Sequence, residues 1–196
     1  MKKLAGPARP KNKKTLRENL NSPALIIISG ALYILSQALM FYILHPIGSG
    51  NVLKLQVCFS DELVRETIEA WKNEGILVNY QRHFIPDFLH PLWYGVFLAS
   101  LMAWLFAKRG AAGYLDLFFI FPLSAALLDI LENVCHLFFI TDIKNVSPFL
   151  SDVSAAASTL KWAFSLASIV VIIVFALRKN KTAKHNAGGF ANKKTR

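Results

Sequence analysis

The sequence predicts an all-α protein in which four transmembrane helices form a bundle. Apolar residues make up 54% of its 196 residues and the mean hydropathy is +0.40, more than a soluble domain of this length needs for its core. Four stretches are each close to the roughly 17 to 25 residues that cross a bilayer. They cover residues 24–44, 88–107, 115–140 and 155–177, so that residues 24–177 form the membrane domain.

The distribution of basic residues predicts the orientation of these spans. Lys and Arg are concentrated before residue 24, after residue 177, and at Lys108 and Arg109, and the formal net charge is +10. This is the pattern of cytoplasmic segments, so both termini are expected in the cytoplasm and the protein in a cell membrane, the bacterial inner membrane. The same basic segments favour contact with anionic membrane lipids over binding of nucleic acid.

The first elements along the chain are a polar tail and an anchor. Residues 1–23 and 178–196 are basic and lack an apolar period, so both are expected to be mobile tails. The apolar run of residues 24–44 is longer than the roughly 7 to 15 residues of a secretory signal core. The first span is therefore predicted to be an uncleaved anchor, and its hydroxyl groups, such as that of Ser36, are expected to pack helices together.

The outer loop, residues 45–87, is predicted to have local structure of its own. Residues 53–59 alternate apolar and polar side chains, which predicts a half-buried extended segment. Ser60 as a cap, followed by apolar side chains at helical spacing, predicts an amphipathic helix over residues 61–74. The face of this helix that carries Trp71 is expected either to lie on the membrane surface or to cap the bundle. The chain then returns to the membrane as a loop.

The second span begins in the segment DFLHPLWYG, where a helix would align Asp87, His90 and Tyr94. Pro91 is equally compatible with the first turn of a helix. The aromatic side chains are expected to form either an interfacial belt or, together with Asp87 and His90, the rim of a cavity.

The third span carries a stripe of small and polar side chains at steps of three or four residues, which places them on one face of a helix. Two central carboxylates cost about 5 to 7 kcal/mol on an insertion scale, which nearly cancels the gain from the apolar residues of this span. The stripe is therefore predicted to face the other spans rather than lipid. Its members are Pro122, Ala125, Ala126, Asp129, Glu132, Asn133 and His136.

The fourth span places one basic residue, Lys161, in a narrow stripe of serines. At a rise of about 1.5 Å per residue, Lys161 and Glu132 lie at the same depth from the outer side. The sequence predicts an ion pair between them, shared with Asp129. In the alternative, Lys161 extends to the membrane surface as an ordinary interfacial residue.

The polar residues do not follow a metal or cofactor motif. Glu132 and His136 are four residues apart, rather than three apart as in carboxylate-bridged di-iron bundles. The sequence also lacks an HExxH motif and paired cysteines, so no metal site is predicted and no cofactor is indicated. Cys58 and Cys135 are expected to be free thiols.

Three segments, LQVCFS, DFLHPLWYG and PLSAALLDILEN, resemble in this order a set of small, uncharacterised bacterial four-span membrane proteins. The similarity covers residues 55–133, and its most specific part is the combination of Pro122, Asp129, Glu132 and Asn133. It implies the four-span topology and the importance of the stripe, but no reaction. The arrangement of four spans with buried acids is also distantly similar in architecture to the emopamil-binding and sigma-2 receptor group, which handles sterol-like ligands. No site residue is carried over from that group.

Three functions are compatible with these features. In the first, an outward-opening polar cavity binds a small ligand, a proton or a cation, and transport by so few spans would require a homo-oligomer. In the second, an intramembrane enzyme acts on a lipid or isoprenoid, with Glu132 or Asp129 as general acid or base and His136 or Tyr94 as its partner. In the third, a structural or assembly protein uses the stripe as a buried polar network. The candidate ligand-binding residues are Asp129, Glu132, Asn133, His136, Lys161, Asp87, His90 and Tyr94.

Overall fold

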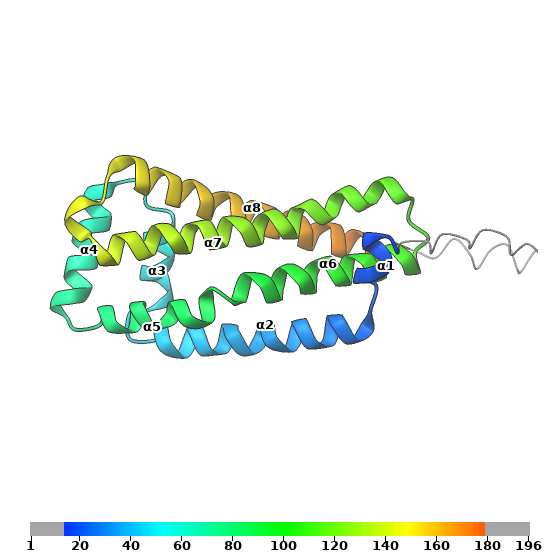
Figure 1. Ribbon diagram of the computed structural model, residues 1–196, viewed down its shortest axis with the longest axis horizontal. Helices are drawn as coiled ribbons and strands as arrows, with labels where there is room; N and C mark the ends of the chain where they lie inside the picture. The colour runs from blue at the N-terminus through cyan, green and yellow to red at the C-terminus, as the bar shows by residue number, and fades with distance from the viewer. Residues whose placement is uncertain (1–13, 179–196) are drawn as a thin grey trace, which may run out of the picture.

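The computed structural model describes residues 14–178, and every regular element in this part of the chain is a helix. Four of the helices are long and apolar enough to cross a membrane, as the sequence predicts. They run side by side along an elongated bundle (Figure 1). They are α2 (Pro23–Leu44), α6 (His90–Lys108), α7 (Ile120–Thr141) and α8 (Pro148–Leu177), and the 3₁₀ helix η1 (Gly113–Phe119) leads into α7.

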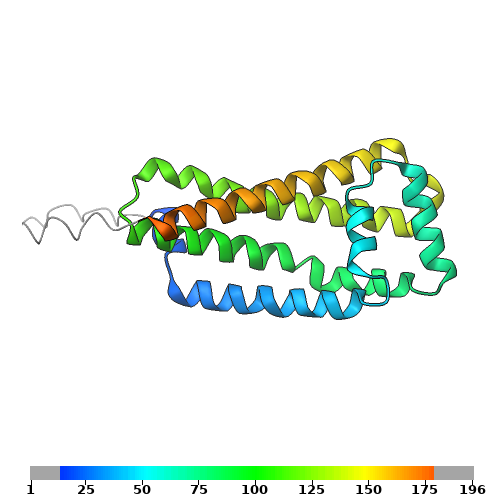
Figure 2. The same cartoon turned by 180° about the vertical axis from the view of Figure 1, so that it is seen from behind.

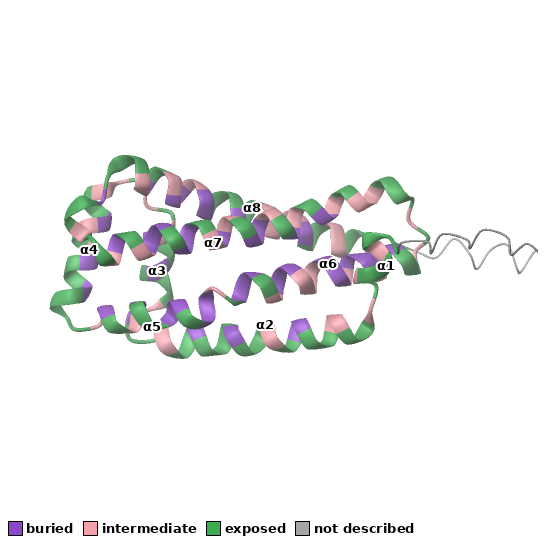
Figure 3. Ribbon diagram, viewed as in Figure 1, coloured by how far each residue is buried: buried purple, intermediate pink, exposed green. Residues whose placement is uncertain are grey.

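Helix α6 lies at the centre of the bundle. It packs against α2, α7 and α8, and α2 and α8 flank it (Figure 2). In the most apolar 18-residue stretch of α6, 56% of the residues are buried, compared with 17% in the corresponding stretches of α2 and α8. Exposed residues run along the outer side of α2, where lipid would contact them (Figure 3). Gly95 allows α6 to approach α7 closely, because a Cβ at this position would lie only 3.1 Å from the Cβ of Ala126.

Serine and proline residues define where two of the long helices begin. The hydroxyls of Ser22 and Ser147 accept hydrogen bonds from the backbone N–H groups three residues further on, and Pro23 and Pro148 follow as first-turn residues. Helix α8 therefore begins at Pro148, earlier than the predicted start of the fourth span at residue 155.

Three short helices cover one end of the bundle, which we call the cap end. They are α3 (Ser49–Gln56), α4 (Asp61–Asn73) and α5 (Leu77–Asp87). Helix α4 confirms the predicted amphipathic helix. Its apolar face packs into a cluster with residues of α5 and of the adjacent end of α7, and consists of Val64, Ile68 and Trp71. This face therefore caps the bundle instead of lying on a membrane surface.

Two parts of the cap end differ from the sequence prediction. The chain is helical in α3, not extended, because Val52 and Leu55, three residues apart, are both buried. In so short a run, alternation of apolar and polar residues is compatible with either period. The connection after Gly75 is the helix α5 rather than a loop, and Tyr80 and Phe84 are buried on one side of it.

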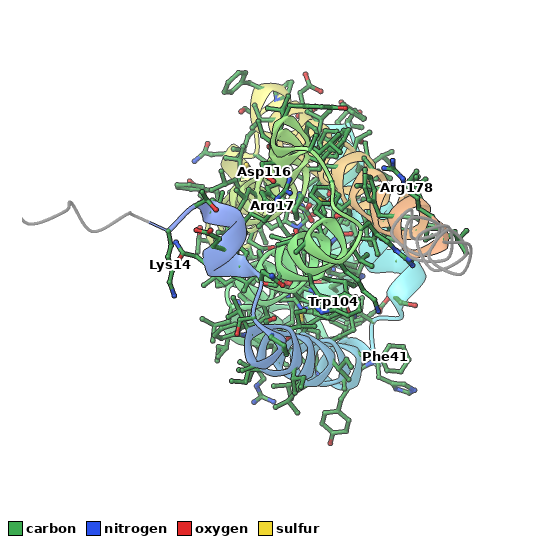
Figure 4. All side chains as sticks on the ribbon, turned by 90° about the vertical axis from the view of Figure 1, so that its right-hand side faces the viewer. Lys14, Arg17, Phe41, Trp104, Asp116 and Arg178 are labelled. Carbon is green, nitrogen blue, oxygen red and sulfur yellow. The ribbon has the colours of Figure 1, made fainter. Side chains whose placement is uncertain are left out.

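The other end of the bundle, which we call the termini end, holds the helix α1 (Leu16–Leu20). Arg17 donates hydrogen bonds to the carboxylate of Asp116 at 2.6 Å and to the carbonyl oxygen of Ala111 at 2.7 Å. Figure 4 looks onto this end and shows Arg17 beside Asp116. Asp116 thus pairs with Arg17 and also lies in the first turn of η1.

The prediction that residues 1–23 form a mobile tail is therefore wrong for part of this segment. Residues 15–20 form a capped helix that packs against α6, because Thr15 and Glu18 form a capping box and Arg17 docks on the bundle. The other predicted tail residues, 1–13 and 179–196, lie outside the described residues.

A second arginine fastens the same end. Arg109 donates hydrogen bonds to the carbonyl oxygens of Phe175 at 3.1 Å and Ala176 at 2.7 Å, where α8 ends. The last carbonyl groups of a helix have no partner within it, and a positive charge there is favourable. The connection between α6 and η1 is thereby attached to the end of α8.

The contacts of Arg17 lead to a first prediction. The Arg17→Ala variant is expected to be less stable by about 1 to 2 kcal/mol, because it loses charge-assisted hydrogen bonds that solvent screens only in part. The measurement is the midpoint of thermal unfolding in detergent, with Lys14→Ala, an exposed basic residue nearby, as control. An Arg17→Ala midpoint equal to that of the control would show that the docked α1 adds nothing to stability.

Candidate functional site

The polar stripe of α7 faces the interior of the bundle. The exposed fraction is 5% for Asp129, 0% for Glu132, and 2% for both Asn133 and His136. The predicted inward orientation is therefore confirmed, and these groups are turned away from the surface that would contact acyl chains.

Lys161 of α8 lies against two of these side chains. Its Nζ is 2.7 Å from Oδ1 of Asp129 and 2.7 Å from Oε2 of Glu132. The hydroxyl of Ser158, one turn earlier on α8, donates a hydrogen bond to the same oxygen of Glu132. The predicted ion pair shared with Asp129 is thus present, and Lys161 is buried rather than extended to an interface. One ammonium group thus contacts two carboxyl groups.

A second polar group lies where α5 meets α6. Asp87 is the last residue of α5 and His90 the first of α6, with Pro91 in the first turn, so the two side chains belong to different helices. Nε2 of His83 lies 3.4 Å from Oδ2 of Asp87. Nδ1 of His90 is hydrogen-bonded at 2.8 Å to the hydroxyl of Ser36 on α2.

The neighbours of Asp87 favour its ionised form. Burial alone would raise the pKa of Asp87, but the hydrogen bond and positive charge of His83, together with the charges of Lys161 and His90, hold this pKa below its usual value. Asp87 therefore adds a further negative charge close to the trio of Lys161, Asp129 and Glu132.

A cavity of about 640 Å³ connects the two polar groups. Five predicted site residues line it: Asp87, His90, Tyr94, Asp129 and Lys161. Apolar side chains make up much of the remaining lining and include Met40, Phe41, Leu44, Val52, Phe97, Leu98 and Ile169. The cavity thus combines a few convergent polar groups with an apolar wall, which is typical of a ligand site.

The cavity lies beside α6, between α2 and α8. Most of its lining residues come from these helices and from α3, which lies across the cap end between α2 and α8 (Figure 2). His83 and Asp87 of α5 and Asp129 of α7 also line it. Exposed apolar residues of the lining include Phe41 at 62%, Trp162 at 53% and Ile169 at 44% on α2 and α8, and Leu53 at 47% on α3. Phe41 projects from α2 on the side where α8 lies (Figure 4). The apolar rim of the cavity is therefore on the lateral surface.

Three predicted site residues lie behind the cavity and do not line it: Glu132, Asn133 and His136. Asn133 donates a hydrogen bond of 3.3 Å to the backbone carbonyl of Asp87 and so links α7 to the end of α5. Nδ1 of His136 is hydrogen-bonded to the hydroxyl of Tyr80. The eight predicted residues therefore divide into a group that lines the cavity and a fully buried group.

Tyr80 and His83 are site residues that the sequence analysis missed. Both lie on α5 and are buried, with 1% and 4% of their surface exposed. Burial, followed by the negative charges of Glu132 and Asp87, raises the pKa of Tyr80 well above its usual value, so its hydroxyl keeps its proton. The helical spacing of Leu77, Tyr80 and Phe84 was the signal that could have identified them.

The two cysteines of the chain, Cys58 and Cys135, are free thiols, as predicted. Among residues 14–178, no group of three His, Cys, Asp or Glu side chains is arranged to hold a metal ion. No protein-family model, curated protein or solved structure matches this chain, so its function has to be inferred from the geometry.

Proposed function

We propose that this protein binds a small amphipathic ligand in the cavity between α2, α6 and α8. The observation that carries this proposal is a cavity of about 640 Å³ with a largely apolar wall, on which five of the predicted polar site residues converge. Lys161 and Asp129 on one side, and Asp87 and His90 on the other, would contact the polar part of the ligand. Phe97, which follows Tyr94 by three positions on α6, would contact the apolar part of the ligand.

The charges at the two ends support the orientation that the sequence predicts. Lys14, Arg17 and Arg178 lie at the termini end (Figure 4), as do Lys108 and Arg109 at the end of α6. The cap end carries instead the acidic first turn of α4. By the positive-inside rule, the termini end would be cytoplasmic and the cap end would face outward, in a membrane such as the bacterial inner membrane.

The ligand would reach the cavity from the bilayer. The sequence analysis expected an opening towards the outer side, but α3 lies across that end, whereas the exposed rim residues Phe41, Trp162 and Ile169 are lateral. A membrane lipid or another molecule dissolved in the bilayer would meet this rim first. Membrane lipids are therefore the first candidates for the bound molecule.

A structural role is the second candidate function, because Glu132 is fully buried and its bonds run to α8 rather than into the cavity. The same observation counts against an enzyme in which Glu132 and His136 act as acid and base on a lipid in the cavity. Of the acid–base groups in that hypothesis, only Asp129 and Tyr94 line the cavity.

The test is native mass spectrometry of the detergent-purified protein. We expect a non-covalent adduct on the wild-type protein, and its loss in Ser165→Phe, where an aromatic ring would occupy the cavity from α8. The matched control is Leu166→Phe, because Leu166 is the next residue on α8, is 62% exposed and does not line the cavity. The same spectra report any homo-oligomer.

Two results would contradict the ligand proposal. One is a wild-type protein without an adduct. The other is an adduct that Ser165→Phe retains to the same extent as Leu166→Phe, since a surface-bound lipid would behave in this way. Equal thermal unfolding midpoints for the two variants would confirm that both are folded.

A further inference from the structure

Two buried polar atoms of α7 have no hydrogen-bond partner among the described residues. They are Oε1 of Glu132 and Nε2 of His136. The two residues are four positions apart in the sequence, so their side chains lie on the same face of α7 in successive turns. Neither side chain lines the cavity, and both are at least 98% buried. A buried polar atom without a partner destabilises a fold unless another species satisfies it.

The other polar atoms of these two side chains are already occupied. Oε2 of Glu132 contacts the ammonium of Lys161 and accepts the hydrogen bond of Ser158. Nδ1 of His136 is hydrogen-bonded to Tyr80. Both side chains are thereby held from α8 or α5, and Oε1 and Nε2 are hydrogen-bonded neither to each other nor to any other described polar atom.

The charge balance around Glu132 is incomplete. Lys161 is the ammonium that both Asp129 and Glu132 contact, so this trio carries a net charge of minus one when both carboxylates are ionised. A buried charge without a counter-charge is costly, and the usual result is that a group changes its protonation state.

The other helices do not supply the missing positive charge at this point. From α5, the titratable groups that face the pair are Tyr80, His83 and Asp87, and His83 already pairs with Asp87. From α6 they are His90 and Tyr94, and His90 is hydrogen-bonded to α2. From α7 itself they are Asp129 and Cys135, and from α8 Lys161. The buried face of α4 is apolar and consists of Val64, Ile68 and Trp71.

We propose that Glu132 is a buried site for one exchangeable proton, which is carried on Oε1. With the proton on Oε1 of Glu132, the trio of Asp129, Glu132 and Lys161 is neutral, and Lys161 pairs mainly with Asp129. Tyr80 keeps its hydroxyl proton and donates a hydrogen bond to Nδ1 of His136, so the neutral imidazole carries its own hydrogen on Nε2. When Glu132 ionises, the proton therefore leaves the site and exchanges with solvent. The site is distinct from the ligand cavity but shares Lys161 with it.

The link through Lys161 makes the site sensitive to Asp129. When the Asp129 charge is removed, Lys161 is left with Glu132 as its remaining carboxylate partner. The ionised form of Glu132 is then favoured and the proton is lost.

The test is infrared spectroscopy of the C=O stretch of protonated carboxyl groups in the detergent-purified full chain at neutral pH. We expect the wild-type protein to show such a band, which shifts in D₂O because the proton exchanges. Glu132→Gln should lose the band. Asp129→Asn should lose it at neutral pH and regain it only when the proton concentration is raised at least tenfold. Glu66→Gln, a change at an exposed carboxylate on α4, should retain it.

Each other result would overturn the proposal. A wild-type protein with ionised carboxylates alone would show that an uncharged partner, such as ordered water, satisfies the two atoms. A band that survives in Glu132→Gln and disappears in Asp129→Asn would place the proton on Asp129. Since the wild-type spectrum alone can exclude the site, the result does not depend on whether each variant folds. The experiment uses no cavity ligand, so it can fail or succeed independently of the proposed function.

Discussion

Replacing Lys161 with methionine is expected to lower the free energy of unfolding by about 3 to 5 kcal/mol, because it removes the positive partner of two buried carboxylates. Methionine has a similar length, so lost packing contributes little. Asp129 and Glu132 would be left 5% and 0% exposed without the ammonium that both contact in the wild-type protein. No other single change in the described part of the bundle removes so much charge pairing.

The measurement is unfolding in detergent followed by circular dichroism, with Lys144→Met as the matched control. Lys144 is exposed in η2 (Ile143–Asn145), so this variant loses the same charge without leaving a buried carboxylate unpaired. The triple variant Lys161→Met, Asp129→Asn, Glu132→Gln should recover much of the loss, because no charge remains buried in the trio. If Lys161→Met is as stable as Lys144→Met, the buried ion pair does not hold α7 and α8 together.

Replacing Trp71 with alanine is expected to cost about 3 to 5 kcal/mol, since a large aromatic side chain is removed from a packed cluster. Trp71 is 5% exposed, and its ring centroid lies 4.9 Å from that of Tyr80. Tyr80 in turn is hydrogen-bonded to His136. Loss of Trp71 should therefore loosen the cap end first and disturb the hydrogen bond between α5 and α7.

Limited proteolysis and thermal unfolding test this prediction. Cleavage within residues 45–87 should be faster in Trp71→Ala than in Leu63→Ala, a matched change on the same helix at a side chain that is 55% exposed. Equal cleavage of the two variants would mean that α4 lies loosely on the bundle and does not cap it.

The bundle and its charged trio were predictable because both depend on regular helical periods. Asp129, Glu132 and His136 recur on one face of α7, and counting turns from the outer end places Lys161 at the depth of Glu132. A lysine in a long apolar run has few ways to avoid lipid, so the partner could be named from the sequence. The structure confirms that pairing.

The cap end was harder to predict because its helices are short and depend on distant contacts. Residues 53–56 fit a strand period as well as a helical one, and only the burial of Val52 and Leu55 against other elements selects the helix. Tyr80 is buried because Trp71 of the preceding helix and His136, 56 positions further along the chain, meet at the same place. No local pattern encodes such a meeting.

The cavity was predictable in its residues but not in its shape. The sequence left open whether Tyr94 belongs to an interfacial belt or, with Asp87 and His90, to the rim of a cavity, and in the structure these three residues line a cavity together with Asp129 and Lys161. The lateral position of the rim follows from α3 lying between α2 and α8, an arrangement that depends on how three helices pack rather than on any one of them.

Two arginines link helices to one another at the termini end of the bundle. Arg17 joins α1 to the segment around Asp116, and Arg109 joins the end of α6 to the end of α8. At the opposite end, α2 and α8 are separated by α3 and by a hollow interior. If α2 and α8 move apart, they should do so at the cap end, because α8 is held at the termini end. Amide hydrogen exchange should therefore be faster in the first turns of α8 than in its last turns.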